Sequence, residues 1–215
     1  MDKKKQTRLA VILVLAILLV DQTVKILVKT HMQIGEEFNV LGSWFRIHFI
    51  ENQGFAFGMA IGGDIGKIVL TLFRLAASGA LIWLLVHLIK KGTRTSSIAY
   101  LSLIVAGALG NLIDSMFYGL IFNESYYQVA TLFPSEGGYG SFLQGRVVDM
   151  FYFPLFEFQW PQWVPLIGGN HFEFFNAIFN VADSAITIGV VWFAVDQFFV
   201  APKRSQSTDI KTMGD

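Results

Sequence analysis

The amino-acid sequence predicts a mainly α-helical membrane protein, with four transmembrane helices and a small extracytoplasmic β-sheet that forms a cradle. Composition is the first reason, because the 215 residues are 53% hydrophobic and only 15% charged, whereas soluble domains carry about 25% charged residues. The second reason is a set of four apolar stretches, each close to the ~20 residues that cross a hydrocarbon core. They lie at 9–28, 67–89, 98–121 and 174–200. We therefore expect one integral membrane domain over residues 1–215.

Charge and cysteine content exclude several classes of function. The formal net charge is zero, so nucleic acid is not an expected partner. Cysteine is absent, which excludes a disulfide framework, a thiol nucleophile and a zinc–thiolate site. The basic N-terminus followed by an apolar run is similar to a secretory signal, but no small-residue cleavage pattern follows it. The first span is therefore expected to stay in the protein as a signal anchor.

Basic residues predict the topology. They form three clusters, which precede the first span, separate the second from the third, and follow the fourth: Lys3, Lys4, Lys5 and Arg8; Lys90, Lys91 and Arg94; Lys203, Arg204 and Lys211. With four spans all three clusters fall on one side, which the positive-inside rule makes cytoplasmic. Both termini are then expected inside, segments 30–66 and 122–173 outside, and the tail 205–215 disordered.

The two outside segments differ in pattern. In the first, FRIHFI at 45–50 alternates its side chains as a half-buried strand does, and EFNVL just upstream is the expected partner strand across a turn at Gly42 and Ser43. The second contains an exposed loop, residues 122–144, and then a proline-interrupted aromatic stretch. Trp160 and Trp163 in that stretch suit the headgroup layer of a bilayer. We expect loop and stretch together to form a lid over the site.

Polar and ionisable residues gather in the outer halves of the predicted spans. A charged side chain at mid-membrane costs roughly 2.5–3.5 kcal/mol, so it needs a reason to persist. Asp21 and Lys25 stand at i and i+4 on one helix face, where an ion pair that supports the helix is the simplest interpretation. The other members of the group are Asn111, Asp114, Asp149, Asn180 and Asp183.

Asp149 and Asp183 are the best candidates for chemistry. Two carboxyl groups that meet in a poorly solvated site tend to share one proton, which leaves one acid and one base near neutral pH. Such a pair can activate water against an amide bond. The segment between Asp149 and Asp183 returns to the membrane, so the topology allows them to meet.

Two other functions remain open on the residues alone. A proton-coupled carrier would use Asp21, Lys25, Asp114, Asp149 and Asp183 as a relay, but a relay needs acids at every membrane depth, whereas these cluster near one face. A purely structural protein would tolerate the loss of either carboxylate.

Five short motifs, in order along the chain, resemble those of the lipoprotein signal peptidases, also called signal peptidase II. The motifs are DQTVK at 21–25, ENQGFAFG at 51–58, GNLID at 110–114, VVDM at 147–150 and FNVAD at 179–183. The resemblance extends from about residue 10 to about residue 200. It implies an aspartyl protease of the bacterial cytoplasmic membrane that removes the signal peptide just before a diacylglyceryl-modified cysteine.

The resemblance also implies partners and residue roles. Diacylglyceryl-modified prolipoproteins and membrane lipids are the implied partners, without a metal, a cofactor or an obligate protein partner. Asp149 and Asp183 match the catalytic pair of the family. The positions that match site-shaping residues are Asp21, Lys25, Asn52, Gly54, Asn111, Asp114 and Asn180.

The chain departs from the family pattern in two ways. The family commonly has arginine directly after the aspartate of the third motif, but here Ser115 follows Asp114. An insertion, residues 122–144, then delays the VVDM motif. Our hypothesis is that Arg146, just before that motif, supplies the positive charge that Ser115 does not.

Overall fold

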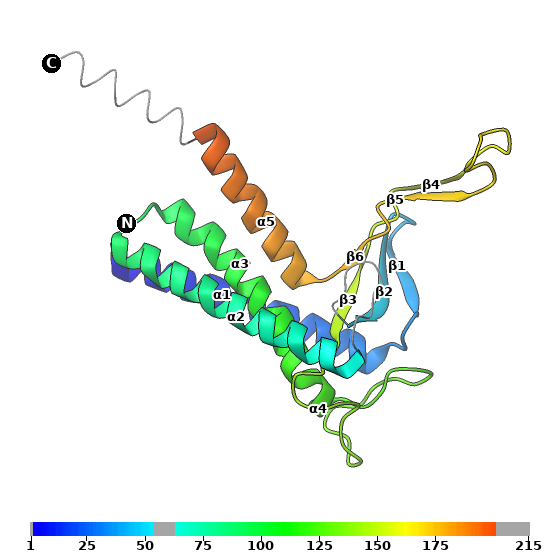
Figure 1. The fold of residues 1–215 in the computed structure, drawn as a ribbon, viewed down its shortest axis with the longest axis horizontal. Coiled ribbons are helices and arrows are strands. Elements are labelled where there is room, and N and C mark those ends of the chain that lie inside the picture. Colours follow the sequence, from blue (N-terminus) through cyan, green and yellow to red (C-terminus); the bar gives the residue numbers. More distant parts are fainter. Residues whose placement is uncertain (1, 54–62, 201–215) are drawn as a thin grey trace. The chain divides into compact units, whose positions relative to one another are not determined.

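The structure is a computed structural model that describes residues 2–53 and 63–200, and Figure 1 shows its elements. As composition predicts, the protein is mainly helical, and the described residues include four helices long and apolar enough to cross a membrane. The helices are α1 (Lys3–His31), α2 (Gly63–Lys91), α3 (Thr95–Ile113), which continues through a π-helical turn (Asp114–Tyr118) into α4 (Gly119–Ile121), and α5 (Val181–Val195), which ends in a second π-helical turn (Asp196–Val200).

Within residues 2–53 and 63–200, six strands accompany the helices. They are β1 (Glu37–Leu41), β2 (Phe45–Asn52), β3 (Val147–Tyr152), β4 (Phe156–Gln159), β5 (His171–Phe174) and β6 (Ile178–Phe179). Strands β1, β2, β3 and β6 form an antiparallel sheet in that order, while β4 and β5 pair separately as a hairpin. The expected strands EFNVL and FRIHFI are β1 and β2, so the predicted small sheet is confirmed.

The last long helix begins later than its apolar stretch. The sequence places the span at 174–200, but α5 starts at Val181. The residues before it are extended, because Phe179 and Ile178 pair with Phe151 and Tyr152 of β3 as strand β6. The sheet therefore holds the chain up to the point where the helix starts.

Contacts divide the chain into two compact units. Of the described residues, the helical unit contains 2–22, 72–112 and 181–200, and the sheet unit contains 23–53, 63–71 and 113–180. The basic cluster beyond residue 200, Gly54 and the tail expected to be disordered lie outside the described residues.

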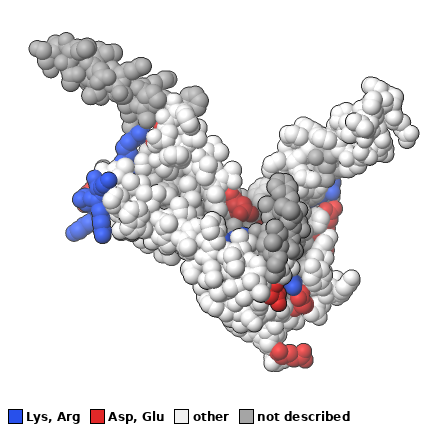
Figure 2. Space-filling view, in the orientation of Figure 1, with Lys and Arg blue, Asp and Glu red and all other residues white. Residues whose placement is uncertain are grey.

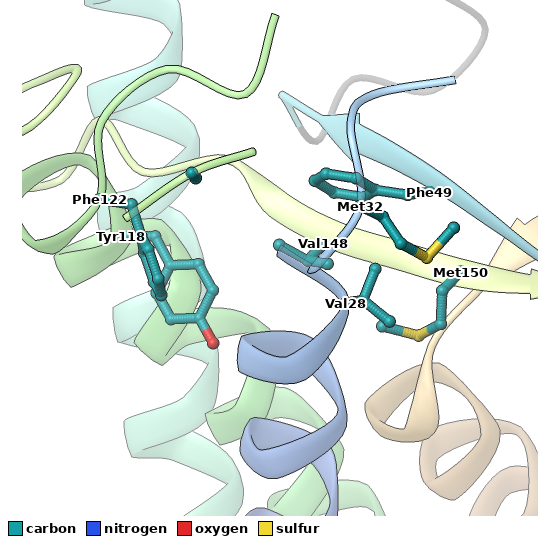
Figure 3. Packing of buried hydrophobic residues seen from close by; sticks show 8 residues of the cluster. Val28, Met32, Phe49, Tyr118, Phe122, Val148 and Met150 are labelled. Carbon is teal, nitrogen blue, oxygen red and sulfur yellow. The ribbon is translucent and has the colours of Figure 1, made fainter. Parts of the chain in front are cut away.

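Each unit has its own apolar core. In the sheet unit, side chains from the end of α1, from β2 and β3 and from the π-helical turn pack together, as Figure 3 shows: Val28, Met32, Phe49, Tyr118, Phe122, Val148 and Met150. In the helical unit, α1, α2 and α3 meet around Ala10, Leu85, Ile98, Tyr100, Leu101 and Val105. The sheet-unit core lies directly beside β3, and so fixes the strand that carries Asp149.

Candidate active site

Asp149 lies on strand β3 of the sheet unit, opposite Ile50 of β2. Its side chain is buried, with 2% exposed. Two amide groups donate to its two oxygens: Asn180 Nδ2 to Oδ1 at 2.6 Å and Asn52 Nδ2 to Oδ2 at 3.3 Å. The amide of Asn180 also donates to the Val148 carbonyl at 3.3 Å. The sheet thus brings together residues from three sequence motifs around one carboxyl group.

Asp114 has a different environment in the same unit. Its Oδ2 atom lies 2.8 Å from Lys25 Nζ, and neither side chain is exposed. The backbone N–H of Val148 also donates to Oδ2, at 3.4 Å. An ion pair between two buried charges is expensive to break, because loss of either partner would leave the other charge uncompensated. Asp114 and Lys25 therefore support strand β3 one residue before Asp149.

A second charged group surrounds Glu51, which is buried at the end of β2. Lys29 Nζ forms an ion pair with Glu51 Oε1, and the Ser125 hydroxyl donates to the same oxygen at 2.9 Å. Arg146 Nη1 donates to Glu51 Oε2 at 3.0 Å. The Arg146 guanidinium also binds Glu124 through two parallel hydrogen bonds, at 2.8 and 2.9 Å. This network ties the insertion at 122–144 to α1 and to the sheet.

Arg146 keeps its charge in this network. Burial by itself would lower the pKa of the guanidinium, but hydrogen bonds to Glu124 and Glu51 raise that pKa above its ordinary value. Tyr139 lies against it, with the guanidinium carbon 4.6 Å from the ring centroid. Burial raises the pKa of the Tyr139 phenol, and its oxygen accepts the Arg146 backbone N–H at 2.6 Å.

Asp183 belongs to the helical unit, in the first turn of α5. Asn111, near the end of α3, donates from Nδ2 to Asp183 Oδ1 at 2.8 Å. An acid near a helix N-terminus is also favoured by the unpaired N–H groups there. Asp183 therefore has the same kind of neutral amide donor in its unit as Asp149 has in the sheet unit.

Asp21 fixes the start of the same helix. Its Oδ1 atom accepts the backbone N–H of Ala182 at 2.8 Å, so it fills the role of a capping residue from another helix. Gly110 makes this approach possible, because a Cβ atom there would lie 2.7 Å from Asp21 Oδ2. At Gly107 a Cβ atom would lie 2.2 Å from the Ala182 carbonyl oxygen. Two glycines of α3 thus allow Asp21 and the first turn of α5 to pack closely against this helix.

The predicted site residues therefore form one group in each unit. The sheet unit brings together Asp149, Asn52 and Asn180, and next to them Asp114 and Lys25, while Arg146 lies with Glu51 and Glu124. The helical unit brings together Asp183 with Asn111, and Asp21 with the start of α5. Gly54 lies outside the described residues.

Sequence reasoning missed Glu51, Lys29, Glu124 and Tyr139. Glu51 opens the motif ENQGFAFG, and a carboxylate at the end of a predicted strand was the one available signal. Its partners come from distant parts of the chain, so their pairing depends on the tertiary structure.

Comparison with known proteins identifies the family. The family described as "Signal peptidase (SPase) II" matches residues 13–199. The chain belongs to the signal peptidase II family. It is therefore a multi-pass membrane enzyme, a signal peptidase of the aspartic type.

Relatives agree over most of the chain. A lipoprotein signal peptidase of Porphyromonas gingivalis is 48% identical over 196 residues, which cover 91% of this chain and 85% of the relative. One from Amoebophilus asiaticus is 35% identical over 184 residues, with 83% and 72% covered.

Solved structures agree on the fold. One bacterial membrane enzyme is 25% identical, with a TM-score of 0.55 over 89% of this chain and 93% of the other. Another bacterial membrane enzyme is 24% identical, with a TM-score of 0.54 over 87% and 86%.

Proposed function

We propose that this peptidase removes the signal peptide from diacylglyceryl-modified prolipoproteins, cutting just before the lipid-modified cysteine, with Asp149 and Asp183 as its catalytic pair. One observation carries the proposal. Each of the two carboxyl groups accepts a hydrogen bond from an asparagine amide, Asp149 from Asn180 and Asp183 from Asn111. A neutral donor fixes the orientation of a carboxyl group without adding a positive charge that would hold it ionised.

The proposed reaction needs one water molecule and one shared proton. The ionised carboxylate takes a proton from water, and the water oxygen forms a bond to the carbonyl carbon of the scissile amide. The protonated carboxyl group donates a hydrogen bond to the carbonyl oxygen, which accepts negative charge. The C–N bond then breaks as the carboxyl group that was protonated at the start gives its proton to the leaving amine, so that the pair again holds one proton, now the one taken from water. Which aspartate starts protonated is a property of the coupled pair.

The remaining predicted site residues have supporting roles in this proposal. Asn52, Asn180 and Asn111 orient the two carboxyl groups. Lys25 and Asp114 brace strand β3 through the Val148 N–H. Asp21 sets the first turn of α5, and Gly54 is proposed from its motif alone.

We propose a bacterial cytoplasmic membrane location with both termini inside and the catalytic pair near the outer face. Figure 2 shows Lys and Arg side chains gathered at the end of the helical unit where α1 begins and α2 ends. Gln6 Nε2 donates to the Thr93 carbonyl at 2.7 Å, which joins the start of α1 to the α2–α3 turn. This basic end supports a cytoplasmic orientation. The substrate's acyl chains would then lie among membrane lipids.

Arg146 is proposed to supply the positive charge that Ser115 does not. The backbone N–H of Gly145 donates to the Ser115 carbonyl at 2.9 Å. Because Arg146 comes directly after Gly145, its backbone lies close to Ser115. We expect Arg146→Ala to lower cleavage and Arg146→Lys, which keeps the charge but loses the two parallel bonds to Glu124, to retain a larger share. Wild-type cleavage by Arg146→Ala, at an equal folded fraction, would remove the hypothesis.

The proposed function is tested with purified enzyme in liposomes. The substrate is a diacylglyceryl-prolipoprotein, and the matched control is the same precursor without the lipid. We expect cleavage directly before the modified cysteine, much slower cleavage of the unmodified precursor, and no effect of a chelator. Failure of a folded enzyme to cleave the lipidated precursor would reject the proposal and return attention to the proton-coupled carrier.

A further inference from the structure

The β4–β5 hairpin has one aromatic face. In the register Phe156 pairs with Phe174 and Phe158 with Phe172, and their rings lie 5.0 and 4.9 Å apart between centroids. Trp160 extends the row, with its ring 5.0 Å from that of Phe158. Two other pairs alternate with these in the register, Glu157 with Glu173 and Gln159 with His171. Gln159 and His171 take the opposite face, since successive side chains of a strand alternate.

The aromatic face is exposed. The four phenylalanines of the row are between 36% and 59% exposed. An isolated two-stranded hairpin is at best marginally stable in water, and this one presents its apolar side chains outward. Such a face needs a covering surface.

The tip of the hairpin continues the apolar surface. Trp163 is 82% exposed, and Leu166 is fully exposed. Leu166 also has a φ of 69°, a conformation that side chains other than glycine adopt at a cost. The loop is nevertheless well hydrogen-bonded. The Trp160 N–H donates to the Asn170 carbonyl, the Gly169 N–H donates to the Trp160 carbonyl, and the Gly168 N–H donates to the Val164 carbonyl, each at 2.9 Å. The loop backbone thus holds an aliphatic side chain pointing outward.

Charge indicates what covers this surface. From Phe158 to Phe172 the sequence has no Asp, Glu, Lys or Arg, and Figure 2 shows a white surface over the end of the hairpin. Tryptophan and phenylalanine without charge suit the boundary between lipid headgroups and acyl chains. The chain also reaches the membrane nearby, because α5, a candidate membrane span, starts seven residues after Phe174.

We propose that the β4–β5 hairpin is a membrane-surface arm. Its aromatic row and its tip enter the headgroup layer of the membrane, and the face of Gln159 and His171 stays toward water. The arm binds lipid through apolar contacts rather than through charge. This surface is separate from the proposed catalytic pair, so its test does not depend on cleavage.

A single-cysteine label tests the arm, because the natural sequence has no cysteine. Leu166→Cys carries a nitroxide spin label in the full-length enzyme, reconstituted in liposomes of zwitterionic phospholipid. Ser135→Cys, an exposed position in the insertion, is the matched control. We expect the Leu166 label to collide several-fold less with a water-soluble nickel chelate, and more with oxygen, than the Ser135 label does.

Two results would overturn the proposal. Equal access of the nickel chelate to both labels would place the tip in water. Protection of the Leu166 label from both the chelate and oxygen would mean that protein covers the label, such as a second copy of this chain. Diluting the protein in the bilayer would then restore the access of both reagents to the label. If the label perturbs folding, a variant that keeps Trp163 as its only tryptophan, with Trp44, Trp83, Trp160 and Trp192 changed to Phe, gives a second readout. We expect bromine carried on the lipid acyl chains to quench its fluorescence, and absence of quenching would also reject the arm.

Discussion

Two buried aspartates of the sheet unit, Asp149 on strand β3 and Asp114 in the π-helical turn that contacts this strand, are held in opposite ways. Asp114 faces Lys25 Nζ at 2.8 Å with both side chains unexposed. Asp149 accepts hydrogen bonds from the side-chain amides of Asn180 and Asn52. The first arrangement fixes a negative charge by a positive one, whereas the second fixes the direction of two oxygens by neutral donors.

Under the proposed function, this difference separates acids that hold the structure from acids that react. An ion pair without water is expensive to break, so Asp114 serves to hold backbone. An acid that must gain and lose a proton in each turnover is better held by groups that accept either state with little rearrangement. By the same criterion Asp183, held by Asn111, belongs with Asp149, and Glu51, held by Lys29 and Arg146, belongs with Asp114.

The largest expected effect on stability comes from breaking the ion pair. Lys25→Met leaves the Asp114 carboxylate buried without its ammonium partner, which lowers the free energy of unfolding by about 3–5 kcal/mol. The double variant Lys25→Met with Asp114→Leu should recover much of that loss. Thermal unfolding in detergent measures both. A single variant as stable as the wild type would contradict the structural role of the pair.

A smaller effect on stability is expected at the contact through which Asp21 caps helix α5. Gly110→Ala places a Cβ atom 2.7 Å from Asp21 Oδ2, and such overpacking costs about 1–3 kcal/mol of unfolding free energy. The displaced carboxylate should also loosen the first turn of α5. The matched control is Gly79→Ala in α2, where a Cβ atom meets nothing within 4 Å. If both variants unfold at the same temperature, the close packing at Gly110 is wrong.

Removing one of the neutral amides that donate to Asp149 has the smallest expected effect, and it is an effect on the cleavage rate. Asn180→Ala deletes the 2.6 Å hydrogen bond to Asp149, and a net loss of about 0.5–1.5 kcal/mol corresponds to a roughly 2- to 10-fold slower cleavage. The loss should appear in kcat, because Asn180 orients the carboxyl group rather than binding substrate. Asn39→Ala, on the exposed strand β1, is the control. Equal rates for the two variants would argue against an orienting amide.

The sequence allowed prediction of the elements that depend on local patterns. Long apolar runs predicted the membrane helices, and the alternation in FRIHFI predicted strand β2 with its partner β1. Spacing and motif predicted Asp149 and Asp183 as the catalytic pair, and this stays a prediction. The start of α5 at Val181 was predicted seven residues too early, because the pairing of β6 with β3 is a tertiary feature.

Other features depend on contacts between distant segments. The partners of Glu51 come from α1, from the insertion and from the residue before β3, and no local pattern specifies such a network. The β4–β5 hairpin was a different kind of omission. FEFQ and HFEF alternate aromatic and polar residues as strands do, but the prolines and tryptophans between them directed the interpretation to the headgroup layer.

Cleavage of a lipidated precursor tests the central claim most directly, when it is measured together with thermal unfolding on the same protein preparations. The variants to compare are Asp149→Asn, Asp183→Asn and the double variant Lys25→Met/Asp114→Leu. We predict that both Asn variants unfold like the wild type and lose cleavage by about 10²–10⁴-fold. The double variant, at an equal folded fraction, should cleave at a rate closer to that of the wild type. Wild-type cleavage by either Asn variant, or a folded double variant as inactive as Asp149→Asn, would contradict the division between structural and reactive acids.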